Sequence, residues 1–455
     1  MPPRWLQALG GLSALLLCLL TLLATKSAPV PVLVGGGSCS KIQGAGDVAV
    51  PSGPGHPGRV NPGSCIQNVM SGWSGRIRRI PPHSSRILLL KRPGEPRVKA
   101  IVKELRHSNE QSLEYEMLAT SVDALLALHV RPKAKGFLAM RPKRPEGLLK
   151  WLAWVWPSLD KHDVLSSIAS GQGVNVVSVA CAECNCVWKK AKGWDMVQIN
   201  VLEFLEGLSN PKQQQYSLLT ANFSDKALAS DSPFLQSAAY THLLNNILGS
   251  FDQKNRKNCF VDQSGKMWAI DFDISSLGSS RRFSQIAANT EQCVRTFWGS
   301  HVLGLDDLHC AMISAMQTKL SVFMGDQFRQ FGHELYAMLR SQHFWDLTSC
   351  PVRANSQQAC LQRMHVPSFF WLYATHTDFP WSAVVLHPQA QGSGRSRGAT
   401  DGAIGAGSDA ESRQPACSVD LPLIWSFILR ARLLNTTAML QIEYDECRLK
   451  APLSL

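Results

Sequence analysis

Short runs of branched and aliphatic residues recur along the first half of the chain. Arg86–Leu90 and Val98–Val102 are two such runs, and a turn that contains Pro and Gly separates them. Runs of the same type follow at Val174–Val179 and Met196–Phe204. Their length and composition are typical of β-strands. We therefore predict a strand-rich first part.

Apolar residues with the spacing of a helix dominate the second half. A first helical pattern already covers Gln111–Leu128, and others follow at Ser237–Leu248, Leu303–Leu347 and around Leu421–Leu440. Apolar residues repeated at every third or fourth position line one face of a helix. A strand-rich part followed by a helix-rich part predicts an α+β fold.

Segments rich in Pro, Gly and Ser interrupt these patterns and mark domain boundaries. Residues 28–75 have the composition of a stalk, and residues 388–416 have that of a disordered loop. The folded domain is therefore predicted at 76–387, and a C-terminal helical segment at 417–455.

One apolar segment is long enough to cross a membrane. Trp5–Thr25 carries no charge and lies between Arg4 and Lys26. A helix spans the hydrocarbon core with about 20 residues, whereas the apolar part of a signal peptide is shorter. We expect residues 1–27 to form a signal anchor in the type II orientation, with the rest of the chain in the lumen. Cleavage of this segment as a signal peptide, followed by secretion, stays open.

Composition narrows the class of protein. The chain has 455 residues, of which 45% are hydrophobic and 18% charged, and these values exclude a wholly disordered chain. A single apolar span excludes a multispan transporter. The net charge is +12, and residues 76–150 carry 17 Lys and Arg against 7 Asp and Glu. This basic part favours polyanionic partners: nucleotide phosphates, acidic peptides, sulfated glycans or lipid headgroups.

Twelve of the 13 cysteines follow the apolar segment, and we interpret them as disulfide-forming residues of a lumenal domain. Cys181, Cys184 and Cys186 are close enough in sequence to suggest zinc, but no second cluster follows at ligand spacing. Asn222 and Asn435 begin Asn-X-Ser/Thr triplets and are candidate glycosylation sites. The chain is thus predicted to be a disulfide-bonded glycoprotein.

The residues after the helical pattern that ends at Gly249 carry most of the candidate chemistry. A polar loop presents Asp252 and Asn258, and a hairpin with a turn at Gly265 leads to Asp271. A spacing of 13 residues lets the hairpin bring Asn258 and Asp271 to one point. Oxygen ligands of this kind bind Mg²⁺ together with a triphosphate, and Asp252 is free to orient a hydroxyl.

This order of helix, Asp loop, Asn, hairpin and Asp resembles the catalytic core of the protein-kinase-like superfamily. The segment Asn246–Asp252 is especially similar to the secretory-pathway kinases: Golgi casein kinase, four-jointed and the Golgi-associated kinases. The resemblance covers roughly residues 76–278 and implies a bilobal kinase-like fold, with a strand-rich N-lobe and a helical C-lobe. It also implies a Golgi membrane protein that uses ATP with Mg²⁺ or Mn²⁺.

The resemblance assigns roles to three residues before the loop. Lys103, in the segment Lys99–Lys103, matches the lysine that binds the ATP phosphates, and Glu116 matches its ion-pair partner. Glu114 is an alternative to Glu116. Glu203 lies in a segment that resembles the strand and hinge holding the adenine.

In and after the loop, the resemblance assigns the catalytic and metal-binding roles. Asp252 matches the residue that orients the attacking hydroxyl. Asn258 and Asp271 match the two metal ligands, and Asn255 is an alternative to Asn258 because the Asp-to-Asn interval is one residue longer than usual.

The sequence also departs from the family pattern. Gln253 stands where these kinases usually have Arg, and Asp273 stands where Gly is usual. No clear Gly-rich phosphate loop precedes Lys103, and Ser71–Gly75 is only a weak candidate for one. A catalytically inactive pseudokinase scaffold is therefore an alternative to an active enzyme.

Together these features predict a lumenal Golgi kinase that transfers the γ-phosphate of ATP to a hydroxyl. Its substrate would be a secreted protein, a membrane protein or a proteoglycan, and nucleic acid is not expected as a partner. The alternative from another class is a type II Golgi glycosyltransferase, in which Asp271-Phe272-Asp273 holds a divalent metal against a nucleotide sugar. That alternative explains one motif, whereas the kinase hypothesis explains Lys103, Glu116 and the Asp252 loop together.

Overall fold

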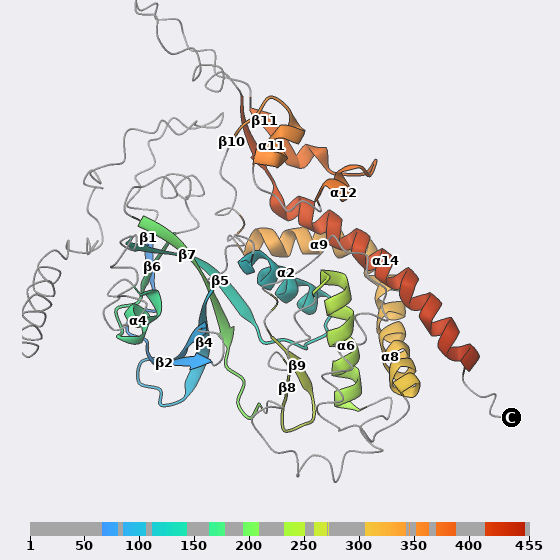
Figure 1. Ribbon diagram of the computed structural model, residues 1–455, viewed down its shortest axis with the longest axis horizontal. Helices are drawn as coiled ribbons and strands as arrows, with labels where there is room; N and C mark the ends of the chain where they lie inside the picture. Colours follow the sequence, from blue (N-terminus) through green and yellow to red (C-terminus); the bar gives the residue numbers. More distant parts are fainter. Residues whose placement is uncertain are drawn as a thin grey trace, which may run out of the picture. The chain divides into compact units, whose positions relative to one another are not determined.

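The computed structural model describes residues 66–80, 85–105, 112–142, 163–177, 194–208, 232–250, 259–270, 272, 305–342, 345, 352–363, 370–387 and 415–450 (Figure 1). All of them belong to one structural unit. The second unit, Met1–Gln43 with Asn61–Gly63, contains none of the described residues.

Seven of the described strands form one curled sheet in which every pairing is antiparallel. The strand order is β1-β6-β5-β7-β4-β3-β2, so the first two strands of the chain lie at opposite edges. The strands are β1 (Ile66–Val69), β2 (Ser74–Ile80), β3 (Ser85–Lys91), β4 (Val98–Leu105), β5 (Ala134–Pro142), β6 (Val174–Val177) and β7 (Trp194–Glu203).

The sheet begins earlier in the chain than the sequence indicated. β1 and the start of β2 lie inside residues 28–75, so the prediction of a stalk is wrong for residues 66–75. The glycines there serve the sheet: Gly72 has a φ of 76° in the turn between the two strands, and a Cβ on Gly75 would overlap the backbone of Leu89. Such glycines cannot be distinguished from linker glycines by composition.

Different helices cover the two faces of the sheet. α2 (Ser112–Leu125) packs against β5 and β7, and α4 (Val164–Ala169) contacts β2, β3, β4 and β6. On the α4 side, Leu88, Val102 and Ile168 belong to an aliphatic cluster of their own. On the α2 side, the buried residues merge with the core of the helical part. The α2 face of the sheet therefore borders the second half of the molecule.

The helical part is built from four long helices and a hairpin. These are α6 (Pro233–Leu248), the strands β8 (Cys259–Val261) and β9 (Met267–Ala269), α8 (Leu305–Asp326), α9 (Phe328–Ser341) and α14 (Leu421–Lys450). α14 contacts α6, α8 and α9, and α2 contacts α6 and α9 (Figure 1). Trp425 and Leu433 of α14 are fully buried in the shared core, so the C-terminal segment is an integral part of this half.

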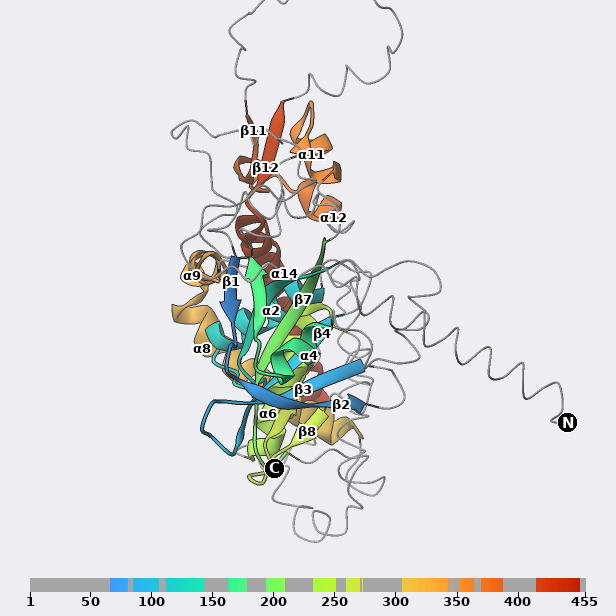
Figure 2. The same cartoon turned by 90° about the vertical axis from the view of Figure 1, so that its left-hand side faces the viewer.

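A small three-stranded sheet precedes α14. It consists of β10 (Val352–Arg353), β11 (Val384–His387) and β12 (Ala416–Val419), in the order β10-β12-β11. The helices α11 (Gln357–Arg363) and α12 (Phe370–Ala374) and the 3-10 turn η5 (Trp381–Ala383) lie between its strands in sequence. Figure 2 shows α11 beside β11 and β12, in agreement with their contacts.

Two disulfides lie within the described part of the chain. They confirm, for four cysteines, the prediction that the cysteines form disulfides. Cys310–Cys447 joins α8 to α14, and Cys360–Cys417 joins α11 to β12. Cys181, Cys184 and Cys186 lie outside the described residues.

The α+β class is confirmed, and the predicted elements agree closely with the observed ones. The helical pattern at Leu303–Leu347 is divided into α8 and α9, and the one at Leu421–Leu440 continues to Lys450. Whether the two halves are kinase-like lobes stays a proposal. No helix among the residues described here is long and apolar enough to cross a membrane, and the predicted anchor Trp5–Thr25 lies outside them.

Candidate functional site

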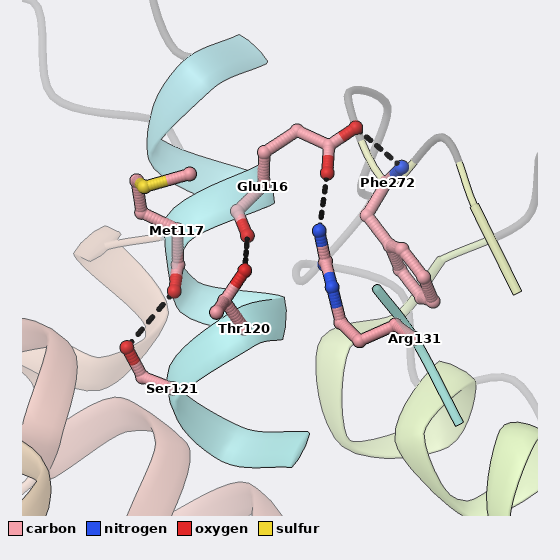
Figure 3. A network of polar contacts seen from close by, with 6 residues as sticks. All are labelled: Glu116, Met117, Thr120, Ser121, Arg131 and Phe272. Atoms are coloured by element: carbon pink, nitrogen blue, oxygen red, sulfur yellow. Dashed lines mark hydrogen bonds and ion pairs between the residues drawn. The ribbon is translucent and has the colours of Figure 1, made fainter. Parts of the chain in front are cut away.

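A buried carboxylate links three separate segments of the chain. Glu116, in the second turn of α2, is 1% exposed. Its Oε2 accepts a hydrogen bond from Arg131 Nη2 at 2.7 Å, and its Oε1 accepts one from the backbone N–H of Phe272 at 3.0 Å (Figure 3). Glu116 thereby connects α2, the loop that precedes β5 and the residue that directly follows Asp271.

The loop between α2 and β5 is shaped to deliver Arg131 to this position. The Oδ1 atom of Asp123, near the end of α2, accepts a hydrogen bond from the Val130 N–H at 2.9 Å. Ala127 and His129 both have positive φ, so the chain turns sharply between these two anchors. Burial raises the pKa of Asp123 above its usual value, and the bond from Val130 opposes that rise.

Arg131 and Glu116 both contact Phe272. The side chain of Arg131 is 2% exposed, and its guanidinium carbon lies 4.9 Å from the centre of the Phe272 ring. The Phe272 backbone is bonded to Glu116, and its ring is packed against Arg131 (Figure 3). The Nε and Nη1 atoms of Arg131 have no hydrogen-bond partner among the described residues. The ion pair therefore has unused donor capacity in a buried location.

The hairpin before Phe272 is fixed to the same loop. A turn at Asp262 joins β8 to β9, with Gly265 at a φ of 84°. The Oδ1 atom of Asp262 accepts hydrogen bonds from the backbone N–H groups of Ser264 and Lys266. At the end of β9, the Ala269 N–H donates to the Val130 carbonyl at 2.7 Å. Asp271 and Asp273 lie outside the described residues.

Lys103 lies on the face of β4 that borders α2. The register between β4 and β7 places it opposite Asn200, and places Ile101 opposite Leu202. Lys103 is half-buried. Asn200 is fully buried, and neither its Oδ1 nor its Nδ2 has a hydrogen-bond partner among the described residues. Glu116 accepts hydrogen bonds from Arg131 and from the Phe272 N–H, and its predicted pairing with Lys103 stays a prediction.

Glu203 is the last residue of β7 and is exposed. Its backbone N–H donates to the Lys133 carbonyl at 2.9 Å, and the next N–H, that of Phe204, donates to the Lys99 carbonyl at 3.1 Å. Both N–H groups are thus used within the sheet. Contact with an adenine would have to involve the carbonyls here or the residues that follow.

The helix that leads into the predicted catalytic loop has a well-defined end. Gly249 adopts the left-handed conformation with a φ of 62° and terminates α6, as the sequence predicts. Arg432 of α14 donates from Nη2 to the Asn246 carbonyl at 2.7 Å and from Nε to the Ile247 carbonyl. A cation at this position also interacts favourably with the helix dipole.

Several predicted site residues lie outside the described part of the chain. They are Asp252, Asn255, Asn258, Asp271 and Asn222. Within the described residues, no group of three or more His, Cys, Asp or Glu side chains could hold a metal ion. Glu114, the alternative to Glu116, is buried in the first turn of α2. Asn435 is exposed on α14, where a glycan could be attached.

Sequence reasoning missed three residues that shape this region: Arg131, Asn200 and Arg432. Arg131 is, apart from His129, the first basic residue after the helical pattern Gln111–Leu128. This position was the only feature of the sequence that could have marked Arg131. Asn200 is a lone polar residue inside an apolar run, and this anomaly could have marked it. Nothing in the sequence indicated that Arg432, 185 residues away from Ile247, would contact the end of α6.

No family model matches the sequence, and no curated protein matches it. The functional assignment therefore rests on the residues and the geometry described above.

Proposed function

We propose that this protein is a lumenal kinase-like phosphotransferase that moves the γ-phosphate of ATP to a hydroxyl of a secreted protein, a membrane protein or a glycan. The observation that carries the proposal is the hydrogen bond from the Phe272 N–H to the buried Glu116 carboxylate. This bond links the helix after the lysine strand to the residue that follows Asp271. Lysine, helix glutamate and metal-binding aspartate are the parts that protein kinases assemble around the phosphates.

The strand order supports the same proposal. Counted from the β2 edge, Lys103 lies on the third strand, β4, and α2 is the next helix in the chain. In protein kinases the phosphate-binding lysine is on the third strand, and its glutamate is on the helix αC. β7, which ends at the hinge candidate Glu203, pairs directly with β4.

Glu116 has a further role in this proposal. Both of its oxygens are engaged, one by Arg131 and one by the Phe272 N–H. We infer that Glu116 and Arg131 are positioning residues that fix the segment carrying Asp271. A buried carboxylate suits this task because its hydrogen bonds are strong where water is excluded.

The proposed reaction uses positioning and electrostatic stabilisation. Lys103 neutralises the ATP phosphates, and Asp271 with Asn258 would hold Mg²⁺ or Mn²⁺ against them. Asp252 orients the substrate hydroxyl and accepts its proton. The hydroxyl oxygen forms a bond to the γ-phosphorus while the bond from that phosphorus to the ADP oxygen breaks.

The described strands favour a kinase over a glycosyltransferase. A nucleotide-sugar transferase with an Asp-X-Asp triplet is expected to place the triplet after a succession of parallel βαβ units. All pairings in the described seven-stranded sheet are antiparallel, and so is the pairing in the hairpin before Phe272.

A lumenal location in the Golgi is part of the proposal. Disulfides persist in the secretory pathway and are rare in the cytosol, and two of them join helices and strands of this chain. The exposed triplet at Asn435 and the predicted anchor at 1–27 support the same compartment.

A thermal-shift titration tests the proposal. The purified protein is titrated with ATP and Mg²⁺ or Mn²⁺, and in parallel with UDP-sugars and Mn²⁺. A ligand that binds only the folded state raises Tm by mass action. We expect a shift with ATP that Asp271→Ala removes and that Asp378→Ala, a change at an exposed aspartate, leaves intact. A shift with a UDP-sugar alone would support the glycosyltransferase, and no shift with either ligand would support a pseudokinase scaffold that binds no nucleotide.

A further inference from the structure

The strand register aligns two long cations on one face of the sheet. In antiparallel strands, residues directly opposite each other lie on the same face. Arg78 of β2 lies opposite Ile87, Ile87 lies opposite Lys103, and Lys103 lies opposite Asn200. We call these four residues the polar row. The row thus runs from the edge strand β2, across the lysine strand, to β7.

The neighbouring row on the same face is mostly apolar. Arg76 lies opposite Leu89, Leu89 opposite Ile101, and Ile101 opposite Leu202. Ile101 and Leu89 are half-buried, and Leu202 is buried. The face therefore combines an aliphatic strip, suited to a flat apolar group, with a parallel row that contains the two cations Arg78 and Lys103.

The cations at the β2 edge are available to a ligand. Arg76 and Arg78 are both exposed, and neither has an ion-pair or hydrogen-bond partner among the described residues. No acidic residue occurs in either row. The spacing between neighbouring strands puts the backbones of Arg78 and Lys103 about 10 Å apart. Two long side chains can approach a single extended anion across that interval.

Two backbone N–H groups of the weak candidate loop Ser71–Gly75 are already used within the fold. The N–H of Gly72 donates to the Gly171 carbonyl and that of Trp73 donates to the Met70 carbonyl, so the weak candidate loop Ser71–Gly75 is occupied by the fold. The connection between β2 and β3 contains Pro81 and Pro82, which have no N–H to offer. The cationic side chains on this face are therefore the candidates for neutralising a phosphate chain.

The inner end of the polar row also lacks a polar partner. Asn200 is 0% exposed, yet its amide oxygen and nitrogen have no hydrogen-bond partner among the described residues. Buried polar groups are nearly always hydrogen-bonded, and leaving one unpaired destabilises the folded state. The orphaned amide beside Lys103 is an independent sign that a polar group belongs on this side of the sheet.

We propose that Arg78 and Lys103 together bind the phosphate chain of a nucleoside triphosphate, with Arg78 replacing the absent Gly-rich loop. The guanidinium presents a planar fork that binds phosphate oxygens in pairs, whereas the Lys103 ammonium acts as a point charge. Arg76, at the end of the apolar row, adds to the positive field. This inference rests on the proposed function, because Lys103 is the phosphate-binding lysine in both.

Titration of the purified protein with three ligands tests the inference. The ligands are ATP with Mg²⁺, inorganic tripolyphosphate with Mg²⁺, and adenosine. We expect Arg78→Gln to weaken the binding of ATP and of tripolyphosphate by tenfold or more, since hydrogen bonds to charged groups are worth about 1.5–3 kcal/mol. The affinity for adenosine stays unchanged. Arg78 is exposed, so the variant keeps the Tm of the unliganded protein.

Lys135→Gln is the matched control. Lys135 is exposed on β5 and lies opposite Val201, which places it on the other face of the sheet. This variant removes one positive charge without touching either row, so it should bind all three ligands like the wild type. A loss of ATP affinity equal to that of Arg78→Gln would overturn the inference, because the effect would then be one of net charge.

The outcomes separate this inference from the proposed function. If the wild type binds ATP and Arg78→Gln binds it equally well, the inference is overturned while the proposed function stands. If the wild type binds tripolyphosphate through Arg78 but not ATP, the phosphate site stands and the proposed function fails. If the wild type binds neither ligand, both are overturned.

Discussion

The buried ion pair between Glu116 and Arg131 gives the sharpest prediction about stability. Both side chains are almost completely excluded from solvent, at 1% and 2% exposure. Removing one partner of such a pair leaves an uncompensated buried charge and costs about 3–5 kcal/mol. Glu116→Leu should lose this amount, since Arg131 would keep its charge and the Phe272 N–H would lose its acceptor.

The double variant Glu116→Leu/Arg131→Met separates the two contributions. Replacing a whole buried pair by apolar residues is often neutral or stabilising. What the double variant still loses is the acceptor for the Phe272 N–H, a cost of about 1–3 kcal/mol. The double variant is therefore expected to be more stable than Glu116→Leu alone, although it carries one more substitution.

Urea denaturation of the wild type, both single variants and the double variant gives the four free energies of unfolding. The coupling energy follows from the cycle. An additive cycle, or a loss below about 1 kcal/mol for Glu116→Leu, would refute the buried pair as described. A conservative control, Glu443→Gln on α14, removes a carboxylate that is 18% exposed and lies 3.1 Å from His309 Nε2, and should cost less.

Three further predictions concern His242, Asn200 and Arg432, of which the first two are buried and the third is half-buried. Burial, and to a lesser extent the charge of His309, lower the pKa of His242 from 6.5 to about 3. Below pH 6.5 the unfolded state therefore binds more protons at this histidine than the folded state does. As the pH is lowered from 6.5 to 3, the free energy of unfolding should fall by about 1.4 kcal/mol per pH unit. This dependence on pH should be weaker in His242→Phe than in the exposed control His376→Phe. Asn200→Leu should raise Tm in the absence of ligand, because it removes two buried polar atoms that have no hydrogen-bond partner among the described residues, and a lower Tm would contradict that assignment. Arg432→Gln should cost about 1.5–3 kcal/mol by freeing the carbonyls at the end of α6, whereas the exposed control Arg448→Gln should not change the thermal denaturation curve.

Individual helices and strands could be predicted because the patterns that indicate them lie within short stretches of sequence. The apolar runs at Arg86–Leu90 and Val98–Val102 lie in β3 and β4, and the helix before Gly249 ends at that residue. The start of the sheet could not be found, because β1 pairs with β6 more than a hundred residues later. Composition alone cannot reveal a partner so distant in sequence.

Only part of the candidate site could be predicted from the sequence. Glu116 could be selected through the resemblance to kinases, with Glu114 as an alternative, but its contacts to Arg131 and Phe272 depend on how loops fold in three dimensions. The row that joins Arg78 to Lys103 depends on strand register, and a shift of one residue would reverse the faces. Such a register is set by packing on both faces of the sheet and cannot be derived from one strand.

The central claim is that Lys103 and the segment after β9 form an ATP site that requires a divalent metal. Equilibrium titration with ATP, in the presence of Mg²⁺ or Mn²⁺ and then with EDTA, tests this claim most directly. We expect saturable binding by the wild type that is lost with EDTA and in Asp271→Ala, while Asp378→Ala binds normally. ATP binding that is independent of the metal and persists in Asp271→Ala, or no ATP binding by the wild type, would contradict it.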